Sequence, residues 1–200
     1  MKKYIGFDID DKKTVACVYM PEIERFKFSM FRTDLEVMQE FLKKERKKGD
    51  EIHLTFEVSG QSGYLYDGLL DLTDTLTVSN PTKMTWIYRT KKKNDRTDAK
   101  KQAILLAVKQ IPRVHMPARA VREWRGLIGH RRKMVEGRTQ CKNRIRAHFK
   151  NRGLANPYRR SWWSKRSLKW MQEKVSEGQT VWYLTLEDLL DELELHEKQI

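Results

Sequence analysis

The sequence predicts an α/β fold in which helices flank a mixed sheet, followed by a long basic helical extension of the coiled-coil type. Short apolar segments alternate with helical patterns over residues 4–81, and a continuous helical pattern begins after residue 113. A chain of 200 residues with 39% hydrophobic content is long enough for one domain with a core plus a helical extension. We expect these parts at residues 1–112 and 113–200.

The amino-terminal elements follow one another with turn residues between them. In chain order we expect strands at Tyr4–Ile9, Thr14–Tyr19 and Arg25–Arg32, a helix at Asp34–Lys48, a strand at Ile52–Gly60, a helix at Tyr64–Leu72 and a fifth strand through Val78-Ser79-Asn80-Pro81.

Two aspartates stand in the most charged segment, Lys91 to Lys101, where an apolar helical pattern starts. Asp95 and Asp98 are three residues apart, so their carboxylates share one face of a helix. A divalent cation would relieve their mutual repulsion and keep both ionised. The alternative is that this pair only caps the helix and compensates its dipole.

Two further acids lie in predicted strands. Asp8 is a charge in an otherwise apolar first strand, and Glu57 lies near the carboxyl end of another strand. Carboxylates at strand ends gather where open α/β sheets place their sites. Simple alternation would also explain Asp8, as a residue that faces solvent. With Asp95 and Asp98 these residues make a candidate group of four acids.

Four short stretches together point to a known family. They are Ile5-Gly6-Phe7-Asp8, Phe56-Glu57-Val58-Ser59-Gly60, Val78-Ser79-Asn80-Pro81 and Asn94-Asp95-Arg96-Thr97-Asp98-Ala99. They resemble the bacterial insertion-sequence transposases, whose amino-terminal domain is RuvC-like, with an RNase H fold and a tetrad of acids called DEDD. The fourth stretch looks like the Asp-Arg-x-Asp-Ala signature of that family, its most specific short motif. The resemblance continues through Val121-Arg122-Glu123-Trp124-Arg125 to Asn143-Arg144-Ile145-Arg146, where the family has a long arginine-rich helix.

The resemblance implies a DNA recombinase of mobile elements, guided by a structured RNA that bridges target and donor DNA. It assigns Asp8, Glu57, Asp95 and Asp98 as catalytic metal ligands, with Asp10 and Asp11 beside them. Oxygen ligands suit Mg²⁺, with Mn²⁺ as a substitute, and two ions would support an in-line phosphoryl transfer. Full-length members carry a serine-bearing carboxyl-terminal domain that the last quarter of this sequence does not resemble. We therefore expect complete strand exchange to need that further domain.

The excess of basic residues indicates a nucleic-acid partner independently of the resemblance. The chain has 41 Lys and Arg against 27 Asp and Glu, a formal net charge of +14. Residues 113–152 hold thirteen Lys or Arg against Glu123 and Glu136, so binding should weaken steeply with salt. The alternative is that the many lysines only keep the protein soluble. The candidate nucleic-acid contacts are Lys91, Lys92, Lys93, Arg96, Arg122, Arg125, Arg131, Arg132, Arg138, Arg144, Arg146, Trp162 and Trp163.

The basic segment also has an apolar side. Apolar residues recur at spacings of three and four from Val121 to Phe149, which predicts a long amphipathic helix. The acidic, leucine-rich segment Thr185–Gln199 could pack on it as a hairpin or as an intermolecular coiled coil, so we expect a homo-oligomer. A solvated acidic helix is the alternative. Trp162 and Trp163 stand among basic residues, so they either stack on unpaired bases or pack on the long helix.

The remaining features of the sequence bear on cellular location, on cysteine-based sites and on two other functional hypotheses. The sequence has no signal peptide and no apolar run of membrane length, which favours the cytoplasm. Cys17 and Cys141 lack CxxC spacing, so neither a zinc site nor a redox pair is indicated. A second hypothesis is a nucleic-acid-binding module in which the acids are vestigial. A third, an actin-like kinase, needs a glycine-rich phosphate loop where Asp10-Asp11-Lys12-Lys13 stands.

Overall fold

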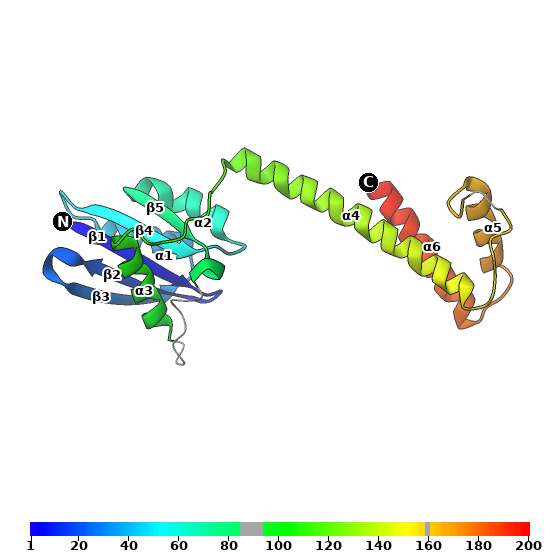
Figure 1. The fold of residues 1–200 in the computed structure, drawn as a ribbon, viewed down its shortest axis with the longest axis horizontal. Helices are drawn as coiled ribbons and strands as arrows, with labels where there is room; N and C mark the ends of the chain where they lie inside the picture. Colours follow the sequence, from blue (N-terminus) through cyan, green and yellow to red (C-terminus); the bar gives the residue numbers. More distant parts are fainter. Residues whose placement is uncertain (85–93, 159–160) are drawn as a thin grey trace. The chain divides into compact units, whose positions relative to one another are not determined.

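A five-stranded mixed sheet organises the first part of the chain (Figure 1). The computed structural model describes residues 1–84, 94–158 and 161–200. The strands are β1 (Lys2–Ile9), β2 (Lys13–Met20), β3 (Arg25–Arg32), β4 (Glu51–Glu57) and β5 (Thr75–Ser79), in the spatial order β3-β2-β1-β4-β5. β2 is antiparallel to β1 and β3, whereas β4 is parallel to β1 and β5. The predicted RNase H-like mixed sheet is confirmed.

Three helices cover the sheet. They are α1 (Leu35–Glu45), α2 (Ser62–Leu69) and α3 (Asp95–Ala107), with 3-10 turns at Pro21–Ile23, Leu70–Leu72 and Pro81–Met84. The predicted start of α1 is confirmed because the Asp34 side chain accepts hydrogen bonds from the backbone N–H groups of Glu36 and Val37, at 3.0 and 3.4 Å. α1 and α2 pack on one face of the sheet, and α3 packs on the other.

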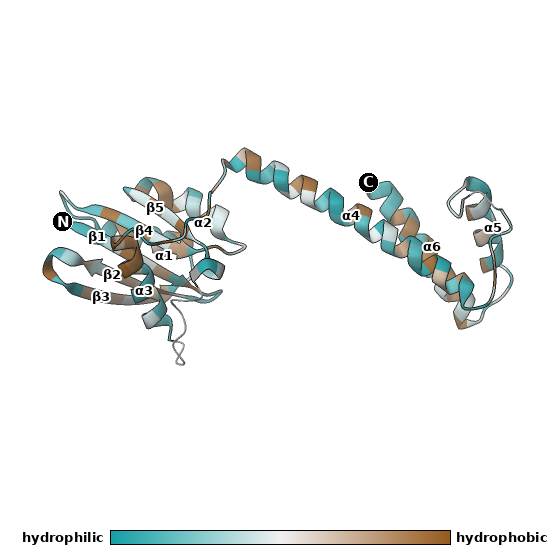
Figure 2. Ribbon diagram, viewed as in Figure 1, coloured by the Kyte–Doolittle hydropathy of each residue, from teal (hydrophilic) through white to brown (hydrophobic). Residues whose placement is uncertain are grey.

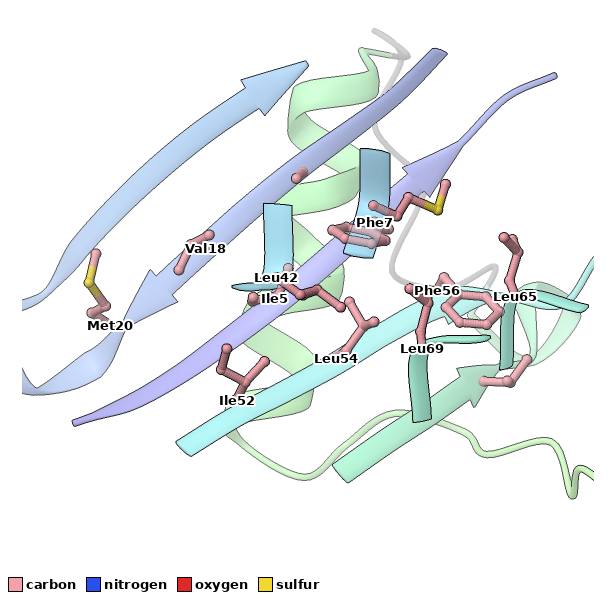
Figure 3. Packing of buried hydrophobic residues seen from close by; sticks show 13 residues of the cluster. Ile5, Phe7, Val18, Met20, Leu42, Ile52, Leu54, Phe56, Leu65 and Leu69 are labelled. Atoms are coloured by element: carbon pink, nitrogen blue, oxygen red, sulfur yellow. The ribbon is translucent and has the colours of Figure 1, made fainter. Parts of the chain in front are cut away.

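Alternation along the strands builds a separate core on each face. Figure 3 shows side chains of β1 and β4 gathered with α2 residues on one side of the sheet, with α3 behind it. This larger cluster includes Ile5, Phe7, Leu54, Phe56, Leu65 and Leu69. On the other face, Val15 and Cys17 of β2 pack against Ala99 and Ala103 of α3. The strand residues that alternate with the larger core therefore face α3.

The residues that follow α3 return to the sheet before the long helix begins. The backbone N–H of Asn80 donates to the carbonyl of Pro112 at 2.9 Å, and that of Val114 donates to Val78 at 2.8 Å. Ser79 and Arg113 form an antiparallel bridge. These contacts belong to the first of two compact units, Met1–Arg122, and the second unit is Glu123–Ile200.

The second unit is helical. Its elements are α4 (Arg119–Lys150), whose first four residues belong to the first unit, α5 (Lys165–Val175) and α6 (Val181–Gln199). The long helix predicted over Val121 to Phe149 is confirmed, and Figure 2 shows hydrophobic residues recurring along it. A buried cluster joins the three helices and contains Cys141, Ile145, Phe149, Met171, Leu186, Leu189 and Leu193.

Ion pairs join α4 to the acidic helix α6. Glu197 lies 3.4 Å from Arg138 and 2.7 Å from Lys142, and Glu192 pairs with Arg144. The acidic segment thus packs on the basic helix within one chain, which is the hairpin alternative. Among the described helices, none has both the length and the apolar character that a membrane crossing needs.

Candidate active site

Asp8 and Glu57 stand at the carboxyl ends of two neighbouring parallel strands. β1 and β4 pair in register as far as Phe7 and Phe56, so the next residues, Asp8 and Glu57, occupy adjacent positions. Both phenylalanines are fully buried on the α1 and α2 side. Because side chains alternate along a strand, both half-buried carboxylates belong to the face that α3 covers.

Gly6 sets how closely α3 approaches this face. A Cβ atom at Gly6 would lie 2.3 Å from the carbonyl oxygen of Ala99 and 2.8 Å from the backbone nitrogen of Ala103. Such distances are too short for any side chain, so the backbone of α3 contacts β1 where only glycine fits. Gly6 is two residues before Asp8, and the contact therefore brings α3 next to the acids.

The first turn of α3 supplies the other two acids. Asn94 caps the helix, because its side-chain oxygen accepts a hydrogen bond from the backbone N–H of Arg96 at 3.0 Å. Asp95 and Asp98 follow in the first turn. The Asp95 side chain is 45% exposed and that of Asp98 only 16% exposed, so Asp98 lies deeper on the sheet.

Lys13 connects the two sets of acids. Its Nζ donates a hydrogen bond to Asp95 Oδ2 at 2.6 Å. The pKa of Lys13 is raised above its ordinary value, chiefly by this hydrogen bond and by the charge of Asp95, with smaller contributions from the charges of Asp10 and Asp8. The charge of one ammonium group is therefore influenced by acids on both β1 and α3.

The four acids fit a divalent cation by donor type, but they do not surround a common point. Carboxylate oxygens are the ligands that Mg²⁺ and Mn²⁺ prefer. Within the described residues, no three His, Cys, Asp or Glu side chains are grouped closely enough to hold an ion. Asp95 contacts Lys13, and Asp98 Oδ1 lies 4.0 Å from Lys101 Nζ. Side-chain rotation would have to replace these lysine contacts for a cation to be held.

Asp10 and Asp11 shape the turn between β1 and β2. The Asp10 carboxylate accepts a hydrogen bond from the Asp11 backbone N–H at 2.7 Å. The Asp10 N–H donates to the Lys13 carbonyl at 3.0 Å. Both aspartates are exposed, so a role beside the four acids would be electrostatic.

Basic side chains from α3 lie over aromatic rings of β3. The Arg96 guanidinium is 4.5 Å from the centre of the Phe28 ring, and Lys100 Nζ is 4.3 Å from that of Phe26. Cation–π contacts of this kind hold the two charges on the side of the sheet that carries the acids. Lys91, Lys92 and Lys93 lie outside the described residues.

The arginines of α4 divide into exposed and paired groups. Arg125, Arg131 and Arg132 are exposed, although Arg132 Nε lies 3.0 Å from Glu136. Arg122 is half-buried, donates to the Pro117 carbonyl at 2.6 Å and pairs with Asp67. Arg138 and Arg144 pair with the glutamates of α6.

Trp162 and Trp163 are both half-buried beside α4. The Trp162 ring is 5.6 Å from that of Phe149 in an edge-on arrangement. Trp163 lies beneath Lys142 and Arg146, whose charged groups are 5.2 and 5.3 Å from its ring centre. These contacts belong to helix packing, the other alternative that the sequence left open for the two tryptophans.

Neither cysteine has the character of a nucleophile. Burial raises the pKa of the Cys17 thiol to about 11. Burial, followed by the charge of Glu192, raises the pKa of Cys141 as well, and its Sγ donates to the Leu189 carbonyl at 3.2 Å. Both thiols stay protonated near neutral pH.

Sequence reasoning missed Lys13 as a member of the site. A turn lysine gives no periodic signal, and it is one of 41 basic residues in the chain. Only the pairing of β1 with β2, and of both with α3, brings it to Asp95.

Comparison with known proteins identifies the family of this chain. The model of the IS110-type DEDD transposase family matches residues 5–152, about three quarters of the chain. The match spans all four acids and the whole of α4, and it confirms the resemblance seen in the sequence. No curated protein matches the chain.

Proposed function

We propose that this chain, which belongs to the IS110-type DEDD transposase family, binds divalent cations through Asp8, Glu57, Asp95 and Asp98 to act on DNA phosphates. The observation that supports this assignment is the shared face: adjacent strand ends carry two of the acids, and the contact at Gly6 brings in the helix with the other two.

The four acids would contribute differently to the reaction. Mg²⁺, when bound, supplies a Lewis acid for a phosphate oxygen and for the leaving oxygen. Asp8 and Glu57 are fixed by the sheet, so they would hold constant positions. Asp95 lies more exposed at the helix start and can rotate away from Lys13. The freed ammonium group of Lys13 would then neutralise charge on the phosphate backbone.

The exposed face of α4 supports polyanionic partners, both DNA and a structured guide RNA. Arg125 and Arg131 have no ion-pair partner within the part of the chain that the structure describes. Their charges are therefore available to phosphates without first breaking a salt bridge.

Apolar side chains on the same helix support a homo-oligomer. Trp124, Leu127 and Ile128 are 65%, 58% and 65% exposed. Such a cluster is unusual on a monomer surface and suits a protein interface.

Cation binding by matched variants tests the assignment. Asp8→Ala and Asp98→Asn should abolish the Mg²⁺ binding that calorimetry measures for the wild type at constant ionic strength, with little effect on folding. Asp71→Asn removes the same charge from an exposed position in the Leu70–Leu72 turn, and it should bind Mg²⁺ like the wild type. Equal binding by Asp98→Asn and Asp71→Asn would reject the assignment.

A second candidate function is a nucleic-acid-binding module with vestigial acids. The ion pair between Lys13 and Asp95 favours it, because a lysine already balances part of the acidic charge. This candidate predicts undiminished affinity for structured RNA in chelator and no Mg²⁺ binding by the wild type.

A further inference from the structure

Three buried polar atoms behind the acids have no hydrogen-bond partner among the described residues. They are Oγ1 of Thr55 and both Nε2 and Oε1 of Gln102. Both side chains are fully buried, with 0% exposure. An unpaired buried donor or acceptor costs free energy that an apolar side chain of the same shape would not. Packing alone therefore does not account for a threonine and a glutamine at these positions.

Thr55 and Gln102 both lie beside Gly6, on the face of the sheet that carries the acids. Thr55 pairs with Gly6 across β1 and β4, and the Cβ of Gln102 is 2.9 Å from the position of a Cβ on Gly6. Thr55 precedes Glu57 by two residues in a strand, and Gln102 follows Asp98 by four residues in a helix. Each spacing keeps the polar residue on the face of its acid.

We propose that Thr55 and Gln102 are positioning residues that orient Asp98 when a divalent cation is bound. The Thr55 hydroxyl donates to Gln102 Oε1, and Gln102 Nε2 donates to the Asp98 carboxylate. Gln and Asp side chains four residues apart on a helix can form this hydrogen bond. A single arrangement thereby gives all three unpaired atoms a partner.

These two hydrogen bonds form a relay from Thr55 through Gln102 to Asp98. The relay replaces the weak contact in which Lys101 Nζ lies 4.0 Å from Asp98 Oδ1. A carboxylate that binds a metal is commonly held in place by an outer hydrogen bond, and loss of that bond lowers metal affinity. The inference rests on the proposed metal-binding function and adds to it the residues that fix the orientation of one ligand.

The test uses substitutions that keep shape and remove polarity. Gln102→Met keeps an unbranched side chain of high helix propensity, and Thr55→Val keeps the branched shape. In chelator, each variant should unfold at a higher temperature than the wild type, because an unpaired buried group is gone. Each should also bind Mg²⁺ more weakly, by about 10- to 100-fold for Gln102→Met. The double variant should bind no more weakly than Gln102→Met, because both residues act through one relay.

Opposite changes in stability and affinity distinguish a positioning role from a purely structural one. Ser167→Ala serves as the control, because it removes a buried hydroxyl that donates to the Ser161 carbonyl at 2.8 Å in the other unit. This control should unfold at a lower temperature and bind Mg²⁺ like the wild type.

The outcomes separate the two proposals. Wild-type Mg²⁺ affinity in Gln102→Met, or a lower unfolding temperature for both variants in chelator, overturns the relay. No Mg²⁺ binding by the wild type overturns the proposed function itself. If Gln102→Met does not fold, Thr55→Val decides between the same results.

Discussion

At the scale of single residues, Gly6 sets how closely α3, which carries Asp95 and Asp98, approaches β1. The atoms that its missing side chain would strike are the backbone oxygen of Ala99 and the backbone nitrogen of Ala103. Backbone atoms of a packed helix cannot rotate aside as a flexible side chain can, so α3 as a whole would have to move.

Gly6→Ala should therefore lower the free energy of unfolding by about 1–3 kcal/mol, the usual cost of forcing extra atoms into a packed interior. It should also weaken Mg²⁺ binding, because α3 carries Asp95 and Asp98. Urea denaturation and calorimetry measure the two effects. Gly60→Ala is the control, since nothing lies within 4 Å of a Cβ there. Equal stability of the two variants would contradict the role given to Gly6.

The four candidate acids could be picked out from the sequence, but their arrangement could not. Asp8 and Glu57 are visible as charges at the ends of apolar strands, and Asp95 and Asp98 as a pair at a helix start. The register that sets Asp8 beside Glu57 is a contact between distant segments, and no local pattern encodes it. The positions of Lys13 and Gln102 against the acids depend on the same tertiary contacts.

At the scale of elements, the pairing of α4 with α6 combines an apolar seam with ion pairs. The hydrogen bond from Lys142 and the nearby charges of Lys142 and Arg138 hold the pKa of Glu197 below its ordinary value of 4.5. A carboxylate whose pKa is depressed in the folded state stabilises that state above its unfolded pKa. The contribution disappears as the pH falls through the lower, folded value.

The free energy of unfolding should therefore fall less below pH 4.5 in Glu197→Gln than in the wild type, since the variant has lost this titration. The difference should be modest, below about 1 kcal/mol, because the Glu197 side chain is 47% exposed and solvent screens the pair. Denaturation at pH 7 and pH 3 measures it. Parallel pH profiles for both proteins would show that Glu197 does not contribute in this way.

Elements with strong periodicity were predictable, and irregular ones were not. β3 has the bounds expected from the alternation of its residues, and α4 follows its apolar spacing. α5 was not predicted, because the aromatic and basic residues before it were weighed only as a nucleic-acid contact or as packing on the long helix. In the structure the Ser164 hydroxyl caps α5 by accepting a hydrogen bond from the Ser167 N–H at 3.2 Å. Residues 112–116 bond to the β5 region through backbone groups that carry no sequence signal.

At the scale of the whole molecule, the acids and the exposed arginines lie in different compact units. The account therefore predicts that nucleic-acid affinity and cation binding can be changed separately. Nucleic-acid affinity depends on the positive charges of the α4 arginines, and cation binding depends on the negative charges of the four acids.

Arg125→Glu combined with Arg131→Glu should weaken binding to DNA or structured RNA. The slope of log affinity against log salt should fall by about one for each lost phosphate contact, while Mg²⁺ binding stays unchanged. Filter binding over a salt series measures this. Lys47→Glu combined with Lys48→Glu, at exposed positions after α1, is the control with the same change in net charge. An equal loss of affinity in the control would indicate a general effect of charge instead of a binding face on α4.

The most direct measurement for the central claim is a crystal structure of the protein with Mn²⁺, located by its anomalous scattering. The account predicts a peak bounded by oxygens of Asp8, Glu57, Asp95 and Asp98, with Lys13 displaced from Asp95. A fully occupied Mn²⁺ site elsewhere, or no peak among these acids at saturating Mn²⁺ with the Lys13 contact intact, would contradict it.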